Sequence, residues 1–125
     1  MENKGLHAIA DAYLVDYPGD AEIMRMCGAA INESRMRVVS CTHKQFLPHG
    51  VTAVWILEES HFSLHTYPEH KYLSVDCYTC GSEGDPLAAV THLLAKLNLA
   101  SHTRRLLKRG GLVFDGIETV GGDEG

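Results

Sequence analysis

The sequence lacks the features that mark membrane, secreted and nucleic-acid-binding proteins. None of its apolar segments approaches the roughly 20 residues that a membrane-spanning helix needs. The N-terminal segment MENKGLHAIA lacks the charged-then-apolar layout of a signal peptide. The one basic cluster, residues 104–109, is short, and the formal net charge is -5, which does not favour a nucleic-acid partner. We therefore expect a cytoplasmic protein with neither a membrane nor a nucleic-acid partner.

The cysteines are too few for a structural zinc site or a disulfide framework. There are four of them, Cys27, Cys41, Cys77 and Cys80, and in a reducing compartment we expect free thiols. A structural zinc site commonly uses two Cys-x-x-Cys pairs, and the chain has one. On a strand, an offset of three points Cys77 and Cys80 to opposite faces. We expect no metal site, and two interpretations of Cys80 remain: a small buried side chain, or a single reactive thiol.

The apolar pattern predicts one domain over residues 1–125 with two helices and six strands. Helical spacing covers residues 21–32, with Asp20 as a candidate N-cap. A second helix begins at Asp85-Pro86, where an acidic cap precedes proline. The strands are predicted at residues 5–15, 36–42, 51–57, 62–66, 72–78 and 102–108. The last of these, His102 to Lys108, is charged and therefore reads as an edge strand, and the glycine-rich residues 111–125 as a flexible tail.

This order of elements indicates an α+β fold. The strands would form a single, largely antiparallel sheet with two helices on one face. The other face is then uncovered unless a second copy packs on it. We therefore expect a homodimer that forms an αββα sandwich.

The segment between Leu57 and Glu69 carries more polar groups than a buried strand tolerates without partners. Glu58-Glu59-Ser60 suits a solvated hairpin tip. On a strand, Ser63 shares a face with His61 and His65, and a serine–histidine pair can support nucleophilic catalysis. However, the G-x-S-x-G motif of many hydrolases and a clear third member are missing from the sequence. Structural hydrogen bonds are the commoner role of such histidines, so from these residues alone the alternatives stay open.

A set of short motifs between residues 46 and 86 keeps a fixed spacing over about a third of the chain. They are Phe46-Leu47-Pro48-His49-Gly50-Val51-Thr52, Glu59-Ser60-His61, His65-Thr66-Tyr67-Pro68-Glu69, Thr79-Cys80-Gly81 and Asp85-Pro86. Together they closely resemble the small bacterial and archaeal S-adenosylmethionine decarboxylases.

The resemblance implies a proenzyme that cleaves itself between Glu59 and Ser60. The products would be a β chain of residues 1–59 and an α chain of residues 60–125. Ser60 would become the pyruvoyl cofactor, which forms a Schiff base with the substrate, and no metal is implied. His65 matches the family's processing histidine, which moves protons. Thr52 matches a position that is usually serine, and its hydroxyl can still assist processing.

The same resemblance implies how the substrate is held. Cys80 matches the family's proton donor. Phe46 and Tyr67 match aromatic positions that flank the adenine, and Tyr67 is more often tryptophan. Glu69 matches the carboxylate that accepts the ribose hydroxyls. In the family each site is built at a dimer interface, in agreement with the uncovered sheet face.

These expectations define a lyase that decarboxylates S-adenosylmethionine and so supplies the aminopropyl donor for spermidine, a polyamine. One alternative is the same pyruvoyl chemistry on arginine or ornithine. Phe46, Tyr67 and Glu69 favour the adenosyl substrate over these. A second alternative is a non-catalytic partner subunit, against which the presence of Ser60, His65 and Cys80 argues.

Overall fold

The structure is a computed structural model that describes residues 4–80, 84–111 and 116–123, the side chains only as far as residue 111. In these residues the elements follow in the order β1 (Gly5–Leu14), α1 (Asp20–Glu33), β2 (Val38–Gln45), β3 (Val51–Leu57), β4 (His61–Tyr67), the 3-10 turn η1 (Pro68–His70), β5 (Tyr72–Thr79), α2 (Pro86–Leu94), β6 (Leu99–Arg109) and β7 (Gly116–Asp123).

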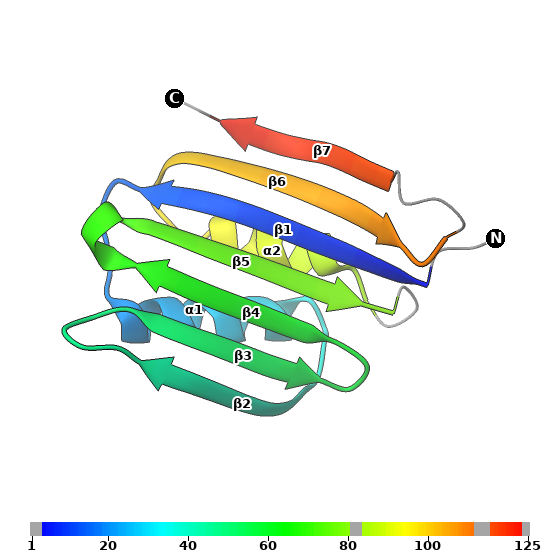
Figure 1. The fold of residues 1–125 in the computed structure, drawn as a ribbon, viewed down its shortest axis with the longest axis horizontal. Helices are drawn as coiled ribbons and strands as arrows, with labels where there is room; N and C mark the ends of the chain where they lie inside the picture. Colours follow the sequence, from blue (N-terminus) through cyan, green and yellow to red (C-terminus); the bar gives the residue numbers. More distant parts are fainter. Residues whose placement is uncertain (1–3, 81–83, 112–115, 124–125) are drawn as a thin grey trace.

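The strands form one sheet of seven in the order β2-β3-β4-β5-β1-β6-β7. Every neighbouring pair is antiparallel. Figure 1 shows α1 and α2 side by side behind the sheet, on the same face. The predicted α+β fold, an antiparallel sheet with two helices on one face, is therefore confirmed.

The core lies between this face and the helices because alternate strand residues point to it. In β3, which lies where the apolar pattern predicted a strand, the buried positions are Val51, Ala53, Trp55 and Leu57. In β1 the same face carries Ala8, Ala10 and Ala12, whose small side chains let α2 pack closely. Phe62, Leu64, Ile23 and Ile31 are fully buried, and each such side chain contributes about 1.5–3 kcal/mol of hydrophobic stabilisation.

The opposite face of the sheet is not covered by any helix of the described part of the chain (Figure 1). Its side chains are polar, aromatic and aliphatic, and several of the apolar ones are exposed. They include Ile9, Tyr13, Ile56 and Tyr67. We call this surface the open face. Exposed apolar groups of this kind are typical of a surface that meets another molecule.

The prediction of an edge strand at His102 to Lys108 is wrong. β7 pairs with β6 over these same residues, from His102 opposite Asp123 to Lys108 opposite Gly116. The sequence pattern missed β7 because its glycines and acids lack an apolar alternation. This strand lies inside the predicted flexible tail, and residues 112–115 and 124–125 of that segment lie outside the described residues.

The predicted helix caps have different outcomes. Asp85 caps α2, because its side chain accepts a hydrogen bond from the Leu87 amide and Pro86 occupies the first turn. Asp20 does not cap α1. Gly19 holds that position, no side chain caps the helix, and Asp20 is the first helical residue. The Asp20 carboxylate instead bonds to residues from other segments.

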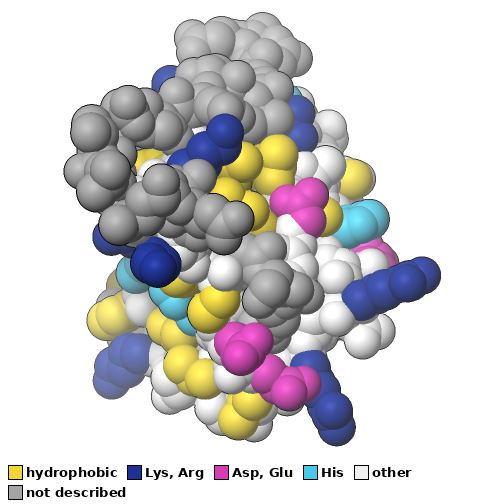
Figure 2. All heavy atoms as spheres, turned by 90° about the vertical axis from the view of Figure 1, so that its right-hand side faces the viewer, with side chains coloured by type: hydrophobic (Ala, Val, Ile, Leu, Met, Phe, Trp, Pro, Cys, Tyr) yellow, Lys and Arg dark blue, Asp and Glu magenta, His cyan; other side chains and the backbone are white. Residues whose placement is uncertain are grey.

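The described helices do not include a membrane-spanning segment, and the surface shown in Figure 2 is mixed in character. Neither α1 nor α2 combines the length and the apolar character that crossing a bilayer requires. Figure 2 shows the end of the molecule at the right of Figure 1, where basic, acidic and hydrophobic side chains are interspersed.

All four cysteines are free thiols, as expected. Burial raises the pKa of the Cys27 thiol far above its ordinary value, with a further increase from nearby Cys41.

Candidate active site at the two ends of a hairpin

The predicted site residues form two groups at opposite ends of the β3–β4 hairpin. Glu59, Ser60 and Cys80 lie at its turn, and the remaining residues surround its open end. Ser60 and His65 are separated by five residues of extended chain, which corresponds to about 16 Å at the rise of a strand. A single copy of the chain therefore does not bring Ser60 and His65 together.

The turn group is organised by the pairing of β4 with β5. Leu57 donates its amide proton to the Ser60 carbonyl across the turn, with an N–O distance of 2.8 Å. His61 is opposite Tyr78 in the register, which brings Cys80 level with Glu59. The Cys80 thiol donates a hydrogen bond to the Glu59 carbonyl oxygen, and Sγ and O are 2.8 Å apart. The carbonyl of the predicted scissile bond therefore has a donor directly on its oxygen.

The two cysteines of the Cys-x-x-Cys motif lie on different sides of their strand. Cys77 is completely buried, whereas Cys80 is exposed beyond the end of β5. This confirms the expected separation of the pair. Of the two interpretations of Cys80, the exposed thiol agrees with a reactive group and not with a buried hydrophobic side chain.

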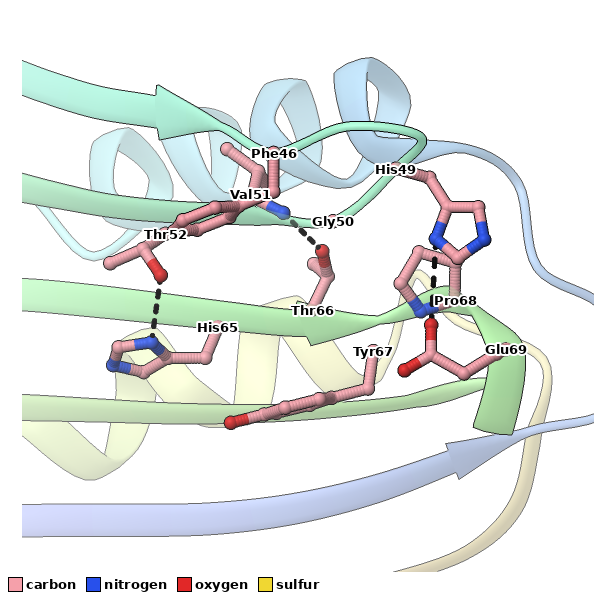
Figure 3. Close-up of a pocket in the computed structure, with 10 residues that line it drawn as sticks. All are labelled: Phe46, His49, Gly50, Val51, Thr52, His65, Thr66, Tyr67, Pro68 and Glu69. Carbon is pink, nitrogen blue, oxygen red and sulfur yellow. Dashed lines mark hydrogen bonds and ion pairs between the residues drawn. The ribbon is translucent and has the colours of Figure 1, made fainter.

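The second group surrounds a cavity of about 310 Å³ at the open end of the hairpin (Figure 3). Its walls come from the loop after β2, the start of β3, the end of β4 and η1. The lining residues are Phe46, His49, Gly50, Val51, Thr52, His65, Thr66, Tyr67, Pro68 and Glu69. In Figure 3 the Phe46 ring lies toward β3 and the Tyr67 ring toward β5. The cavity has the size and the aromatic walls of a small-molecule site.

Two polar pairs lie in this cavity. Thr52 is directly opposite His65 in the β3–β4 register, and Thr52 Oγ1 is 3.1 Å from His65 Nδ1. His49 Nδ1 is 3.4 Å from Glu69 Oε2. The sequence analysis did not single out His49, because a histidine between proline and glycine is typical of an exposed turn. The pairs show that the extra methyl of Thr52 does not keep its hydroxyl from His65.

A further cluster, which the sequence analysis missed, lies on the open face beside the hairpin turn. Asp76 Oδ2 contacts His7 Nε2 at 2.7 Å and His61 Nε2 at 3.3 Å. Ser63 donates to the other carboxylate oxygen. Burial alone would raise the pKa of Asp76, but the hydrogen bonds from Ser63 and His7 and the charges of His7 and His61 outweigh it, so the pKa is lowered. The carboxylate is therefore ionised at neutral pH.

His7, His61 and Asp76 each offer a ligand atom, and these atoms lie within 4.8 Å of one another. Such a set can hold a metal ion or a proton. Arg109 Nη1 is 3.5 Å from His7 Nδ1, and arginine can only donate. The Arg109 guanidinium is therefore a second donor beside the ring of His7, and Asp76 accepts at the Nε2 side. The positive charge of Arg109 beside His7 favours a hydrogen-bond network over a metal site.

The Ser63–histidine interpretation is not supported by these contacts. Ser63 donates to Asp76, and His65 contacts Thr52. Ser63 is therefore bonded to a carboxylate that is itself held by two imidazoles. No single pattern in the sequence indicates this cluster, because His7 and Asp76 are 69 residues apart.

Comparisons with known proteins identify the family of the chain. The family model for S-adenosylmethionine decarboxylase matches residues 6–110. An S-adenosylmethionine decarboxylase proenzyme of Sulfurihydrogenibium is 35% identical over 109 residues, 85% of this chain and 82% of the relative. A second such proenzyme, from Bacillus anthracis, is 35% identical over 115 residues, 89% of this chain and 94% of the relative.

Solved structures give the same result. The crystal structure of adenosylmethionine decarboxylase from Aquifex aeolicus superimposes with a TM-score of 0.80 at 31% identity, and the match covers 92% of this chain and 98% of that one. A Trypanosoma brucei AdoMetDC structure, at 15% identity and a TM-score of 0.59, shares the fold over 82% of this chain and 45% of that one. On the family match and these identities, the chain belongs to the S-adenosylmethionine decarboxylase family.

Proposed function

We propose that this chain is a self-cleaving, pyruvoyl-dependent decarboxylase of S-adenosylmethionine that supplies the aminopropyl donor for spermidine. The observation that carries the proposal is the hydrogen bond from the Cys80 thiol to the Glu59 carbonyl oxygen, 2.8 Å long. It joins the family's proton-donor position to the family's cleavage position.

Self-cleavage follows from the chemistry of the hairpin turn. The Ser60 hydroxyl attacks the Glu59 carbonyl carbon, and the acyl group moves from nitrogen to oxygen to give an ester. The Cys80 thiol stabilises the negative charge that develops on the carbonyl oxygen during this attack. Loss of the Ser60 α-proton then eliminates the Glu59 carboxylate and leaves dehydroalanine. Its hydrolysis with loss of ammonia gives the new N-terminal group of the α chain.

The residues around Ser60 fit a pyruvoyl group. A pyruvoyl carbonyl supplies an electron-accepting centre for decarboxylation. Residue 60 lies where a tight turn meets the start of β4, with its own carbonyl held by Leu57. The Cys80 thiol is hydrogen-bonded to the carbonyl oxygen of Glu59, the preceding residue, and is exposed. It can therefore deliver a proton to a substrate bound at residue 60.

The cavity at the other end of the hairpin suits an adenosyl group. Phe46 and Tyr67 line it with side chains that are 46% and 44% exposed, so both rings are open to stacking. Aromatic faces also attract a sulfonium cation. Glu69 presents carboxylate oxygens that can accept two ribose hydroxyls.

A second copy of the chain completes the site. Ser60 and His65 are about 16 Å apart along the extended chain of β4, too far for a direct proton transfer. Two open faces packed around a two-fold axis would place the hairpin turn of one protomer against the cavity of its partner. The resulting αββα dimer contains two such sites.

The test is intact-mass analysis of the purified protein followed by assay of carbon dioxide release. We expect two fragments, residues 1–59 and 60–125, with a pyruvoyl group in place of Ser60. Carbon dioxide should be released from S-adenosylmethionine but not from arginine or ornithine. Ser60→Ala should remain uncut. A wild-type protein that stays a single full-length species after prolonged incubation would overturn the proposal.

A further inference from the structure

Asp20 accepts hydrogen bonds from four residues in three segments of the chain. Its Oδ2 accepts from Gln45 Nε2 and from the Gly50 amide, each at 2.9 Å. Its Oδ1 accepts from Thr66 Oγ1 at 2.9 Å and from the Tyr17 hydroxyl. These donors lie 25, 30, 46 and 3 residues away in the sequence. The carboxylate therefore holds the start of α1 to the loop after β2 and to the end of β4.

Two of the distant donors, Gly50 and Thr66, line the cavity themselves, and each of the three adjoins another residue that lines it. Gln45 precedes Phe46, Gly50 follows His49, and Thr66 precedes Tyr67. Asp20 itself does not line the cavity. Its effect on a bound molecule must therefore pass through the backbone of the two segments that carry the aromatic rings.

Other hydrogen bonds make this connection stiff. Thr66 Oγ1 donates to Asp20 and accepts from the Val51 amide at 2.8 Å (Figure 3). Gln45 Nε2 also donates to the Gly50 carbonyl at 2.8 Å. Gly50 has φ 107°, a conformation that favours glycine. The loop between Gln45 and Val51 is therefore tied to β4 at several points, and Asp20 is common to most of them.

The charge of Asp20 strengthens these bonds. Burial alone would raise its pKa, but the hydrogen bonds from Tyr17, Gln45, Gly50 and Thr66 outweigh burial and lower it. Hydrogen bonds to an ionised acceptor are stronger than those between neutral groups. A negative charge in the first turn of a helix is also favourable, but Glu22 lies in the same turn and serves that purpose too.

We propose that Asp20 is a positioning residue for the adenosyl part of the substrate: it fixes the separation between Phe46 and Tyr67. The inference rests on the proposed function of the cavity. The rings of Phe46 and Tyr67 can both stack on one adenine only if the distance between the loop after β2 and the end of β4 is constant. Asp20 supplies the acceptor that both segments share.

The test compares Asp20→Asn with Glu22→Gln in the full-length, self-cleaved enzyme. Asn keeps one oxygen but turns an amide donor toward groups that are themselves donors. We expect the KM for S-adenosylmethionine to rise about tenfold, as for the loss of a hydrogen bond to a charged group. The kcat per cleaved chain should stay within about twofold, because bonds at the cavity and not at residue 60 are lost. Glu22→Gln removes a first-turn charge that pairs with Arg25, and should leave both constants unchanged.

A second variant and a binding measurement protect the test against simple misfolding. Gln45→Met removes one donor from an exposed position and should raise KM in the same direction by a smaller factor. Calorimetric titration of the uncut Ser60→Ala protein with methylthioadenosine should show the same loss of affinity when Asp20→Asn is added. An unchanged KM, or a fall in kcat at constant KM, overturns the inference. A wild-type protein that neither cleaves nor decarboxylates overturns the proposed function instead.

Discussion

The thiol of Cys80 donates to the carbonyl oxygen of Glu59 across a Sγ–O distance of 2.8 Å, and the two residues are 21 positions apart in the sequence. The antiparallel register of β4 and β5 brings them level. One side chain is thereby placed for two successive tasks. It can polarise the Glu59 carbonyl before cleavage and donate a proton beside residue 60 afterwards.

Replacement of Cys80 by alanine should slow self-cleavage by at least about tenfold, because the developing oxyanion loses its donor. The fraction of cut chain over time, measured by intact mass, gives the rate. The cut fraction should decarboxylate poorly and inactivate itself by transamination. Cys41→Ala is the matched control, since Cys41 is also exposed but lies on β2. Equal cleavage rates for the wild type and Cys80→Ala would exclude a role of Cys80 in polarising the Glu59 carbonyl.

Mixed dimers should reveal that the site spans two copies. Neither Ser60→Ala nor His65→Ala should cleave on its own. Co-expressed with different tags, they form dimers in which the Ser60 of one protomer meets the His65 of its partner. We expect the His65→Ala chain alone to be cut in these dimers, as seen by mass. If neither chain is cut in a verified mixed dimer, the site does not span the interface.

The cluster of His7, Asp76 and His61 should behave as a hydrogen-bond network. Asp76→Asn removes the charge that both imidazoles contact, and we expect a loss of about 1–3 kcal/mol in the free energy of unfolding. Urea denaturation measures this loss, and Asp11→Asn on the same face, which weakens one exposed hydrogen bond from Tyr72, should cost less. Zinc or a chelator should leave the melting temperature of the wild type unchanged, and a rise with zinc would indicate a metal site.

The stability of the protein should fall in acid because of Asp20 and Asp76. Their pKa values are lowered in the folded state, so protonation favours the unfolded chain. Their contribution is complete above the ordinary pKa of about 3.9 and is lost as the pH falls through the lower folded-state pKa values. Urea unfolding from pH 7 to pH 3 should show a shallower acid decline in Asp20→Asn than in the wild type. Parallel pH curves would contradict this assignment.

Local patterns in the sequence predicted those parts of the fold that depend on neighbouring residues. The apolar run VTAVWIL predicted the strand β3, and Asp85-Pro86 predicted the start of α2, because a strand segment and a helix cap involve residues only a few positions apart. The motifs from Phe46 to Pro86 were sufficient to indicate the family. Two expectations failed because they depend on contacts between distant segments. Asp20 bonds to residues up to 46 positions away instead of capping its own helix. β6 is not an edge strand, because it pairs with β7, a strand without an apolar pattern.

The sequence by itself determined the two helices, the strands β1 to β6, the family and the residue types available for catalysis. Only the tertiary structure decided which of them meet. Strand register brings Cys80 to Glu59 and Thr52 to His65, yet it keeps Ser60 and His65 at opposite ends of one hairpin. The pairing of β1 with β5 places His7 beside Asp76, and the position of α1 against the sheet places Asp20 beside Thr66. These contacts join segments far apart in the chain, and their geometry depends on the packing of the whole sheet.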